Sequence, residues 1–101
     1  MTDAERDKIY DSYLEWKRLK VLPFLERRNQ AFKKQIMARK LYLAADDALD
    51  RHEANKMFVD QLKRAFDKTS EQSNKAQKEY LNALDRFNLE AYLKEYKTNN
   101  D

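Results

Sequence analysis

The sequence contains no glycine and no cysteine, and Pro23 is its only proline. Without glycine, few turns can take the positive φ angles that tight hairpins and phosphate-binding loops require. This absence argues against sandwiches, barrels and dinucleotide-binding folds. It favours long helices joined by very few connections.

The lack of cysteine excludes disulfides, thiolate nucleophiles and cysteine-based metal centres. Together with the absence of a signal peptide, it predicts an intracellular, cytoplasmic protein. No apolar run approaches the roughly 20 residues of a membrane span, so we expect no transmembrane segment.

The sequence does hold enough apolar material to fold. Its 101 residues are 42% hydrophobic and include twelve aromatic residues, which is too many for a disordered tail. We expect a single helical domain over residues 1–101. A chain of this length buries only about 60–70% of its unfolded surface, so a partner or a second copy would add stability.

The first helix is predicted over residues 3–21. Thr2 and Glu5 form a capping box, which places the start of the helix at Asp3. Its end is predicted at Leu22–Pro23, because proline disfavours helical geometry in the residue before it. We expect a kink or a short connection there.

The second helix is predicted over residues 24–66, where neither glycine nor proline interrupts the chain. One apolar stripe contains Leu25, Phe32, Ile36 and Leu43. A second stripe, rotated from the first, contains Leu41, Ala45, Ala48, Asn55, Val59, Leu62 and Phe66. Either the helix breaks near residues 44–47, with Asp46 or Asp47 as N-cap, or it continues against different partners. We favour continuity.

A loop is predicted over residues 67–74, which lack apolar residues and hold a second capping box at Thr69 and Gln72. The last helix is predicted over 70–97, followed by a frayed tail, 98–101. Asn88 provides an alternative, because it could cap a separate short helix. The predicted fold is therefore all-α: an elongated helical hairpin or three-helix bundle with long, coiled-coil-like helices.

Charge is segregated along the chain. Residues 17–40 carry nine basic residues against one acidic residue, a net charge of +8, and lie between two blocks, 1–16 and 41–60, of −3 each. The positive charges of residues 17–40 repel one another. Phosphate backbones, anionic membrane surfaces or an acidic protein would relieve this repulsion. The candidate anion-binding or nucleic-acid-binding residues are Arg27, Arg28, Lys33, Lys34, Arg39 and Lys40.

No residue pattern indicates catalysis. His52 is the only histidine, and the sequence around it has Lys56 where a zinc-binding H-E-x-x-H motif needs a second histidine. The serines lack a histidine base, and the carboxylates are strung along helices without a cleft. We expect no enzyme activity, no metal and no cofactor.

The terminal residues Tyr92, Leu93 and Tyr96 leave the preceding apolar stripe, and tyrosine is favoured where one end of a side chain is buried and the other wet. We predict that they bind a partner. The predicted function is a non-enzymatic helical interaction protein that binds another protein or self-associates as an oligomer. The alternative is a nucleic-acid-binding accessory protein that uses the basic segment 17–40.

Overall fold

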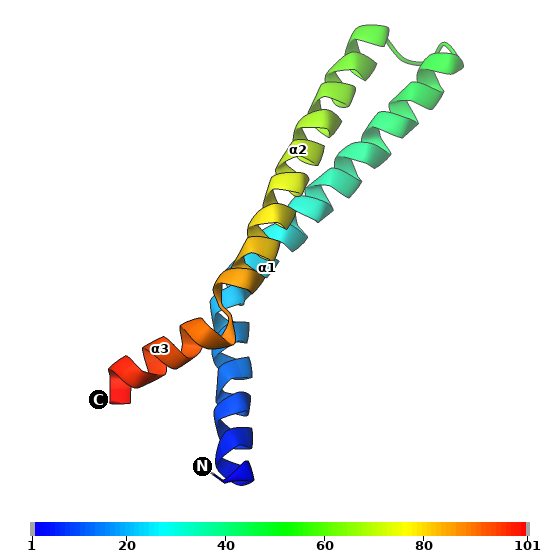
Figure 1. The fold of residues 1–101 in the computed structure, drawn as a ribbon. Helices are drawn as coiled ribbons and strands as arrows, with labels where there is room; N and C mark the ends of the chain where they lie inside the picture. The colour runs from blue at the N-terminus through cyan, green and yellow to red at the C-terminus, as the bar shows by residue number, and fades with distance from the viewer. Residues whose placement is uncertain (1, 101) are drawn as a thin grey trace. The chain divides into compact units, whose positions relative to one another are not determined.

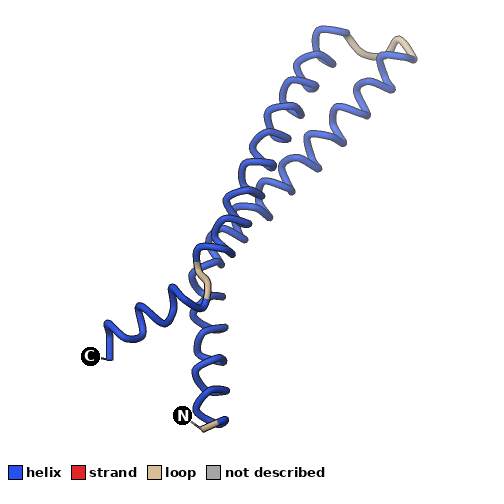
Figure 2. Tube along the Cα trace, in the orientation of Figure 1, coloured by secondary structure: helices blue, strands red, loops and turns tan. Residues whose placement is uncertain are grey.

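In a computed structural model, the described residues 2–100 form three helices: α1 (Asp3–Asp50), α2 (Lys56–Arg86) and α3 (Leu89–Asn100) (Figure 1). The all-α prediction is confirmed, and so is the pairing of two long helices in a hairpin, formed by α1 and α2. Two short connections separate the helices, as Figure 2 shows in tan.

The chain divides into two compact units. The first, which we call the terminal unit, combines Met1–Glu26 with Glu79–Asp101. The second, Arg27–Lys78, is the hairpin unit. The expectation of one domain over residues 1–101 stays a prediction.

The start of α1 confirms the predicted capping box. The backbone N–H of Glu5 donates to Thr2 Oγ1 at 3.2 Å, and the backbone N–H of Thr2 donates to Glu5 Oε2 at 3.4 Å. The helix begins at Asp3, and the acidic residues of its first turn favour the positive end of the helix dipole.

The short connection predicted at Leu22–Pro23 is wrong, because α1 continues through Pro23, whereas the alternative of a kink there stays a prediction. Proline removes one backbone hydrogen bond, and its ring is exposed on the outer side of the helix, where water can solvate the freed carbonyl. Val21 is buried and Phe24 is half-buried, so the helix face away from Pro23 is packed. Burial on that face favours the continuous helix despite the lost bond.

The predicted continuous helix over residues 24–66 is also wrong, since the chain turns between Asp50 and Lys56. His52 has a φ of 61°, the left-handed conformation that usually calls for glycine. The backbone N–H of Glu53 donates to the Ala48 carbonyl at 2.7 Å, and that of His52 to the Leu49 carbonyl at 3.0 Å. These two bonds form a Schellman motif that ends α1 without glycine.

Asn55 is the N-cap of α2, and neither Asp46 nor Asp47 caps a new helix, because both lie inside α1. The Asn55 carboxamide oxygen accepts a hydrogen bond from the backbone N–H of Met57 at 2.7 Å, which satisfies a donor of the first helical turn. Asn55 was expected in an apolar stripe. Asparagine is a preferred N-cap residue, and this property could have predicted the start of α2 at Lys56.

The hairpin unit is held by a seam with heptad spacing, in which positions alternate at intervals of three and four. The seam residues of α1 are buried or half-buried and are Arg28, Ala31, Gln35, Ala38, Tyr42, Ala45 and Leu49. Those of α2 are Val59, Leu62, Phe66, Thr69, Ser73 and Ala76. The rings of Tyr42 and Phe66 meet across the seam with their centroids 6.1 Å apart.

The predicted loop over residues 67–74 is helical and lies within α2. Thr69 does not cap a helix there, because its hydroxyl donates to the Phe66 carbonyl at 2.8 Å. Ser70 accepts a hydrogen bond from Gln35 Nε2 at 3.2 Å, and Ser73 is only 1% exposed. This stretch lacks large apolar residues because small ones fit where α1 and α2 pack against each other.

The alternative for the C-terminal region is confirmed: Asn88 caps a separate helix, α3. The backbone N–H of Ala91 donates to Asn88 Oδ1 at 2.9 Å, and the side-chain amide of Asn88 donates to the Asp85 carbonyl at 3.0 Å. Helix α3 reaches Asn100. The predicted frayed tail, 98–101, is therefore wrong for residues 98–100, which are helical, and Asp101 lies outside the described residues.

The turn at His52 can be tested by removing its Cβ. We expect His52→Gly to raise the free energy of unfolding by about 0.5–1 kcal/mol, because glycine takes a positive φ without steric cost. His52→Ala retains the Cβ and removes the imidazole, so it should change the free energy of unfolding by only a few tenths of a kcal/mol. Urea denaturation followed by circular dichroism measures both, and equal effects would contradict the assignment.

The packing at Ser73 gives a second test. Its buried Oγ forms no hydrogen bond with any described residue. We therefore expect Ser73→Ala to stabilise the protein by about 0.5–1 kcal/mol, since it removes an unpaired polar atom and adds helix propensity. Ser73→Leu should destabilise it by about 1–3 kcal/mol through overpacking. Thermal unfolding compares the two, and a tolerated leucine would show that the helices are loosely packed.

Candidate protein-binding surface

An aromatic cluster forms the core of the terminal unit. Tyr13 and Tyr92 are each 8% exposed, and their ring centroids lie 5.8 Å apart. The Trp16 ring lies 5.3 Å from Tyr92 and meets Phe87 edge-on at 5.7 Å. Such tilted and edge-to-face contacts stabilise aromatic pairs beyond the burial of their area.

One polar contact ties α3 to α1 beside this cluster, and a second orders α1 itself. The indole N–H of Trp16 donates to Glu95 Oε2 at 3.1 Å, so a tryptophan in the fourth turn of α1 fixes the middle of α3. The Lys17 ammonium donates to the Tyr13 hydroxyl at 3.3 Å and lies 5.7 Å from the ring centroid. The cluster thus sets where the exposed side of α3 lies relative to the first turns of α1.

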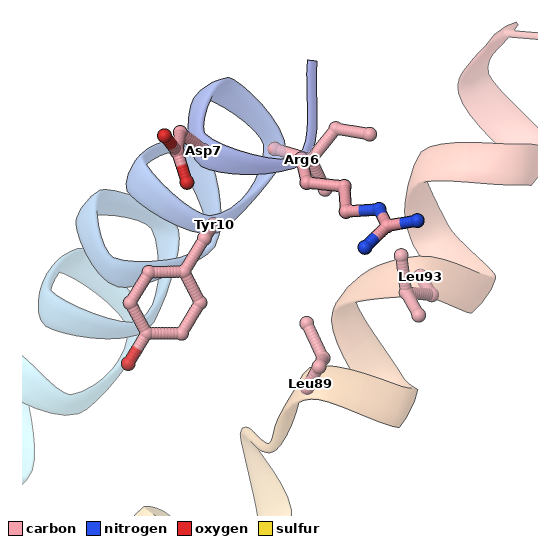
Figure 3. Close-up of a pocket in the computed structure, with 6 residues that line it drawn as sticks. Arg6, Asp7, Tyr10, Leu89 and Leu93 are labelled. Carbon is pink, nitrogen blue, oxygen red and sulfur yellow. The ribbon is translucent and has the colours of Figure 1, made fainter. Parts of the chain in front are cut away.

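The first turns of α1 and the start of α3 enclose a groove of about 390 Å³, which we call groove A (Figure 3). Its apolar walls are Ile9 and Tyr10 from α1 and Leu89 and Leu93 from α3. Arg6 extends from α1 toward Leu93, and Asp7 lies on the α1 side. Tyr10, Leu89 and Leu93 are 54%, 42% and 37% exposed, so the groove presents open apolar surface.

A second groove of about 270 Å³, groove B, lies further along α1 in the same unit. It is lined by Leu14, Lys17, Arg18, Val21, Leu22, Leu25, Tyr80 and Leu84. Tyr10 of groove A and Leu14 of groove B are four residues apart, so they share one face of α1. Apolar surface therefore continues along α1 from one groove to the next.

Charge at groove B is partly compensated within α1. Arg18 Nη2 lies 2.7 Å from Glu15 Oε1, with both side chains exposed. The hydrogen bond from Arg18, reinforced by its charge, lowers the pKa of the Glu15 carboxyl and raises that of Arg18. Arg18 therefore lines groove B with its charge already paired to Glu15.

The three predicted partner-binding residues are placed differently from one another. Tyr92 is buried in the aromatic cluster, whereas Leu93 lines groove A and Tyr96 is 42% exposed. Tyr96 and Tyr92 border a further hollow on the other side of Ile9. Partner binding by Leu93 and Tyr96 stays a prediction. Tyr92 instead packs against Tyr13 and Trp16 in the core of the terminal unit.

The six predicted anion-binding residues all lie on α1 within the hairpin unit. Five of them are exposed: Arg27, Lys33, Lys34, Arg39 and Lys40. Arg28 is half-buried in the seam, with its guanidinium carbon 5.2 Å from the Phe32 ring centroid. The exposed cations are spread around the helix, so they do not converge on one narrow stripe as in a helix that reads a DNA groove.

The described residues contain neither a membrane-spanning helix nor a cluster of metal ligands. No helix there is long and apolar enough to cross a membrane. In the same residues, no three His, Asp or Glu side chains gather as a metal ion would require. Comparison with protein-family models, characterised proteins and solved structures gives no significant match.

Groove A contains residues that the sequence analysis did not select. Ile9, Tyr10 and Leu89 line it, and none of them is among the predicted partner-binding residues. Their juxtaposition depends on α3 folding back at Asn88, because about eighty residues separate the two walls. The predicted cap at Asn88 was the sequence feature that pointed to this change of direction.

The aromatic cluster predicts unequal roles for two tyrosines of α3. Tyr92→Ala should lower the free energy of unfolding by about 3 kcal/mol, because it leaves a cavity against Tyr13 and Trp16. Tyr96→Ala removes a more exposed ring and should cost less than about 1 kcal/mol. Urea denaturation followed by Trp16 fluorescence tests this order, and similar losses would contradict it.

Proposed function

We propose that this protein is a non-enzymatic helical interaction protein whose groove A receives an apolar helix, from another protein or from a second copy. The observation that carries the proposal is the open apolar wall formed by Tyr10, Leu89 and Leu93. Amphipathic helices bind such grooves through residues spaced three and four apart.

The balance of buried and exposed apolar residues supports a binding role. Among the described residues, thirteen large hydrophobic side chains are exposed, whereas six hydrophobic residues are buried. Scattered single exposed leucines are ordinary on a protein surface. Contiguous ones beside grooves are typical of interaction sites.

Groove A is better suited to binding than to catalysis. Its walls are aliphatic and aromatic, with Arg6 and Asp7 as its only charged lining residues. General acid–base catalysis needs a proton donor and acceptor held at a reacting atom. The lining of groove A offers contact area instead.

Nucleic-acid binding through residues 17–40 is the second candidate function. The hairpin unit holds thirteen basic and seven acidic residues, a net charge of +6, which favours polyanions. Binding of this kind weakens steeply as salt rises, whereas an apolar helix interface does not. Titration with labelled DNA and RNA over a range of salt concentrations therefore separates the two functions.

Groove A is tested by the double variant Leu89→Glu/Leu93→Glu. It should reduce the fluorescence of a bound apolar dye by about half or more, because two charges enter the groove. If a second copy is the occupant, the rise in mass with concentration seen by light scattering should also disappear. Circular dichroism checks that the helices remain folded.

The matched control is Leu19→Glu/Leu81→Glu, which alters two leucines of the same unit that are 55% and 49% exposed. Neither lines groove A or groove B. Dye binding and association should stay close to wild type in this variant. Equal losses in both double variants would contradict a role specific to groove A.

A further inference from the structure

One face of α1 in the hairpin unit combines exposed apolar residues with bordering lysines. Met37 and Leu41 are 68% and 56% exposed, and Ala44 is exposed one turn further along. At about 100° per residue, these three side chains fall within an arc of about 60°. We call this surface the lysine-bordered face.

The cations at this face lack compensating charges. Lys33 and Lys40 follow one border of the apolar arc, and Lys34 follows the other. All three are exposed, and none forms an ion pair with another described residue. Between residues 27 and 45 the chain has no aspartate or glutamate. Negative charge must therefore come from elsewhere.

We propose that the lysine-bordered face binds an acidic amphipathic helix of a partner protein. Such a helix places apolar residues against Met37 and Leu41 and carboxylates against the lysines on both borders. The net charge of +6 on the hairpin unit would speed its approach. This surface lies on a different unit from groove A and does not depend on it.

The residues of the face favour a protein helix over lipid or nucleic acid. Its centre is small, because Ala44 and half-buried Ala48 follow Leu41, and small residues allow close approach of two helices. Helices that lie in a membrane surface present bulky Trp, Phe and Leu residues. Surfaces that bind single strands interleave aromatic rings for base stacking. The lysine-bordered face has no aromatic residue.

The same helix provides an internal comparison. Ile36 and Leu43 are 53% and 49% exposed, on a neighbouring face of α1. That face also carries Asp47, which pairs with Arg51 at 3.2 Å, and the exposed Asp50, and both carboxylates lower its net positive charge. It therefore matches the lysine-bordered face in exposed apolar residues and shares Lys40 as a border, but it differs by two carboxylates.

The experiment measures binding of a synthetic helical peptide of about four heptads with leucine and alanine on one face and glutamate beside it. A peptide of the same composition in scrambled order is the reference. Fluorescence anisotropy should show salt-dependent binding of the helical peptide, at least about tenfold tighter than the scrambled one. Met37→Ser/Leu41→Ser should weaken it about tenfold, and Ile36→Ser/Leu43→Ser by less than about twofold.

Charge variants complete the design. Lys33→Gln/Lys34→Gln/Lys40→Gln should weaken peptide binding about tenfold and flatten its salt dependence. The matched variant Lys68→Gln/Lys75→Gln/Lys78→Gln removes three exposed lysines from α2 and should leave affinity within about twofold. All variants change exposed residues, and circular dichroism confirms their helicity.

Three results would overturn the proposal. The first is equal binding of the helical and scrambled peptides. The second is equal weakening by the two apolar double variants or by the two lysine triple variants. The third is that phosphatidylserine vesicles or single-stranded RNA bind more tightly than the helical peptide and are released by Met37→Ser/Leu41→Ser, which would assign the face to lipid or nucleic acid.

Discussion

The structure of the hairpin unit depends on small residues along the seam between α1 and α2. Ala31, Ala38 and Ala45 recur every seven residues on α1, and α2 places Ser73 and Ala76 in its own seam. Small side chains let the two helix backbones approach, but they fill little volume and bury little apolar surface. Larger apolar residues of α1 are therefore left on its flanks. The small residues of the seam thus account for the large apolar residues left exposed beside it.

This constraint explains where sequence reasoning failed. Large apolar residues at helical spacing predict a packing face, yet Ile36 and Leu43 are about half exposed. The stretch 67–74 was predicted as a loop because it lacks such residues, yet it is helical and holds the most buried serine, Ser73. Composition predicts burial well when cores are built from Leu and Phe. It predicts burial poorly where alanine and serine line a close helix pair, because the same residues also occur in loops.

Local capping signals were reliable at Thr2 and Asn88, but the capping box predicted at Thr69 and Gln72 lies inside a continuous helix. The Thr2 capping box and the Asn88 cap are geometries of three or four consecutive residues, and the structure contains both. The turn at His52 was not predicted because a non-glycine residue takes a positive φ there. Two backbone hydrogen bonds hold this conformation, and backbone bonds leave no pattern in the side chains of the sequence. Groove A escaped because Ile9 and Leu89 meet only through tertiary packing. The sequence patterns thus predicted the all-α class, the hairpin of two long helices and two caps, but they misplaced the turns and missed the pairing of distant residues.

The exposed apolar residues are not needed for the fold that they flank. Replacing Met37 or Leu41 by a polar residue would leave the alanine seam unchanged, since neither side chain lies in it. Large exposed apolar residues also carry a cost, because they promote non-specific association of a free chain. The lysines beside them offset that cost by charge repulsion between copies, and they select against cationic partners. The lysine-bordered face therefore disfavours association between copies of this face, because their lysines repel one another. It stays accessible to a helix of opposite charge.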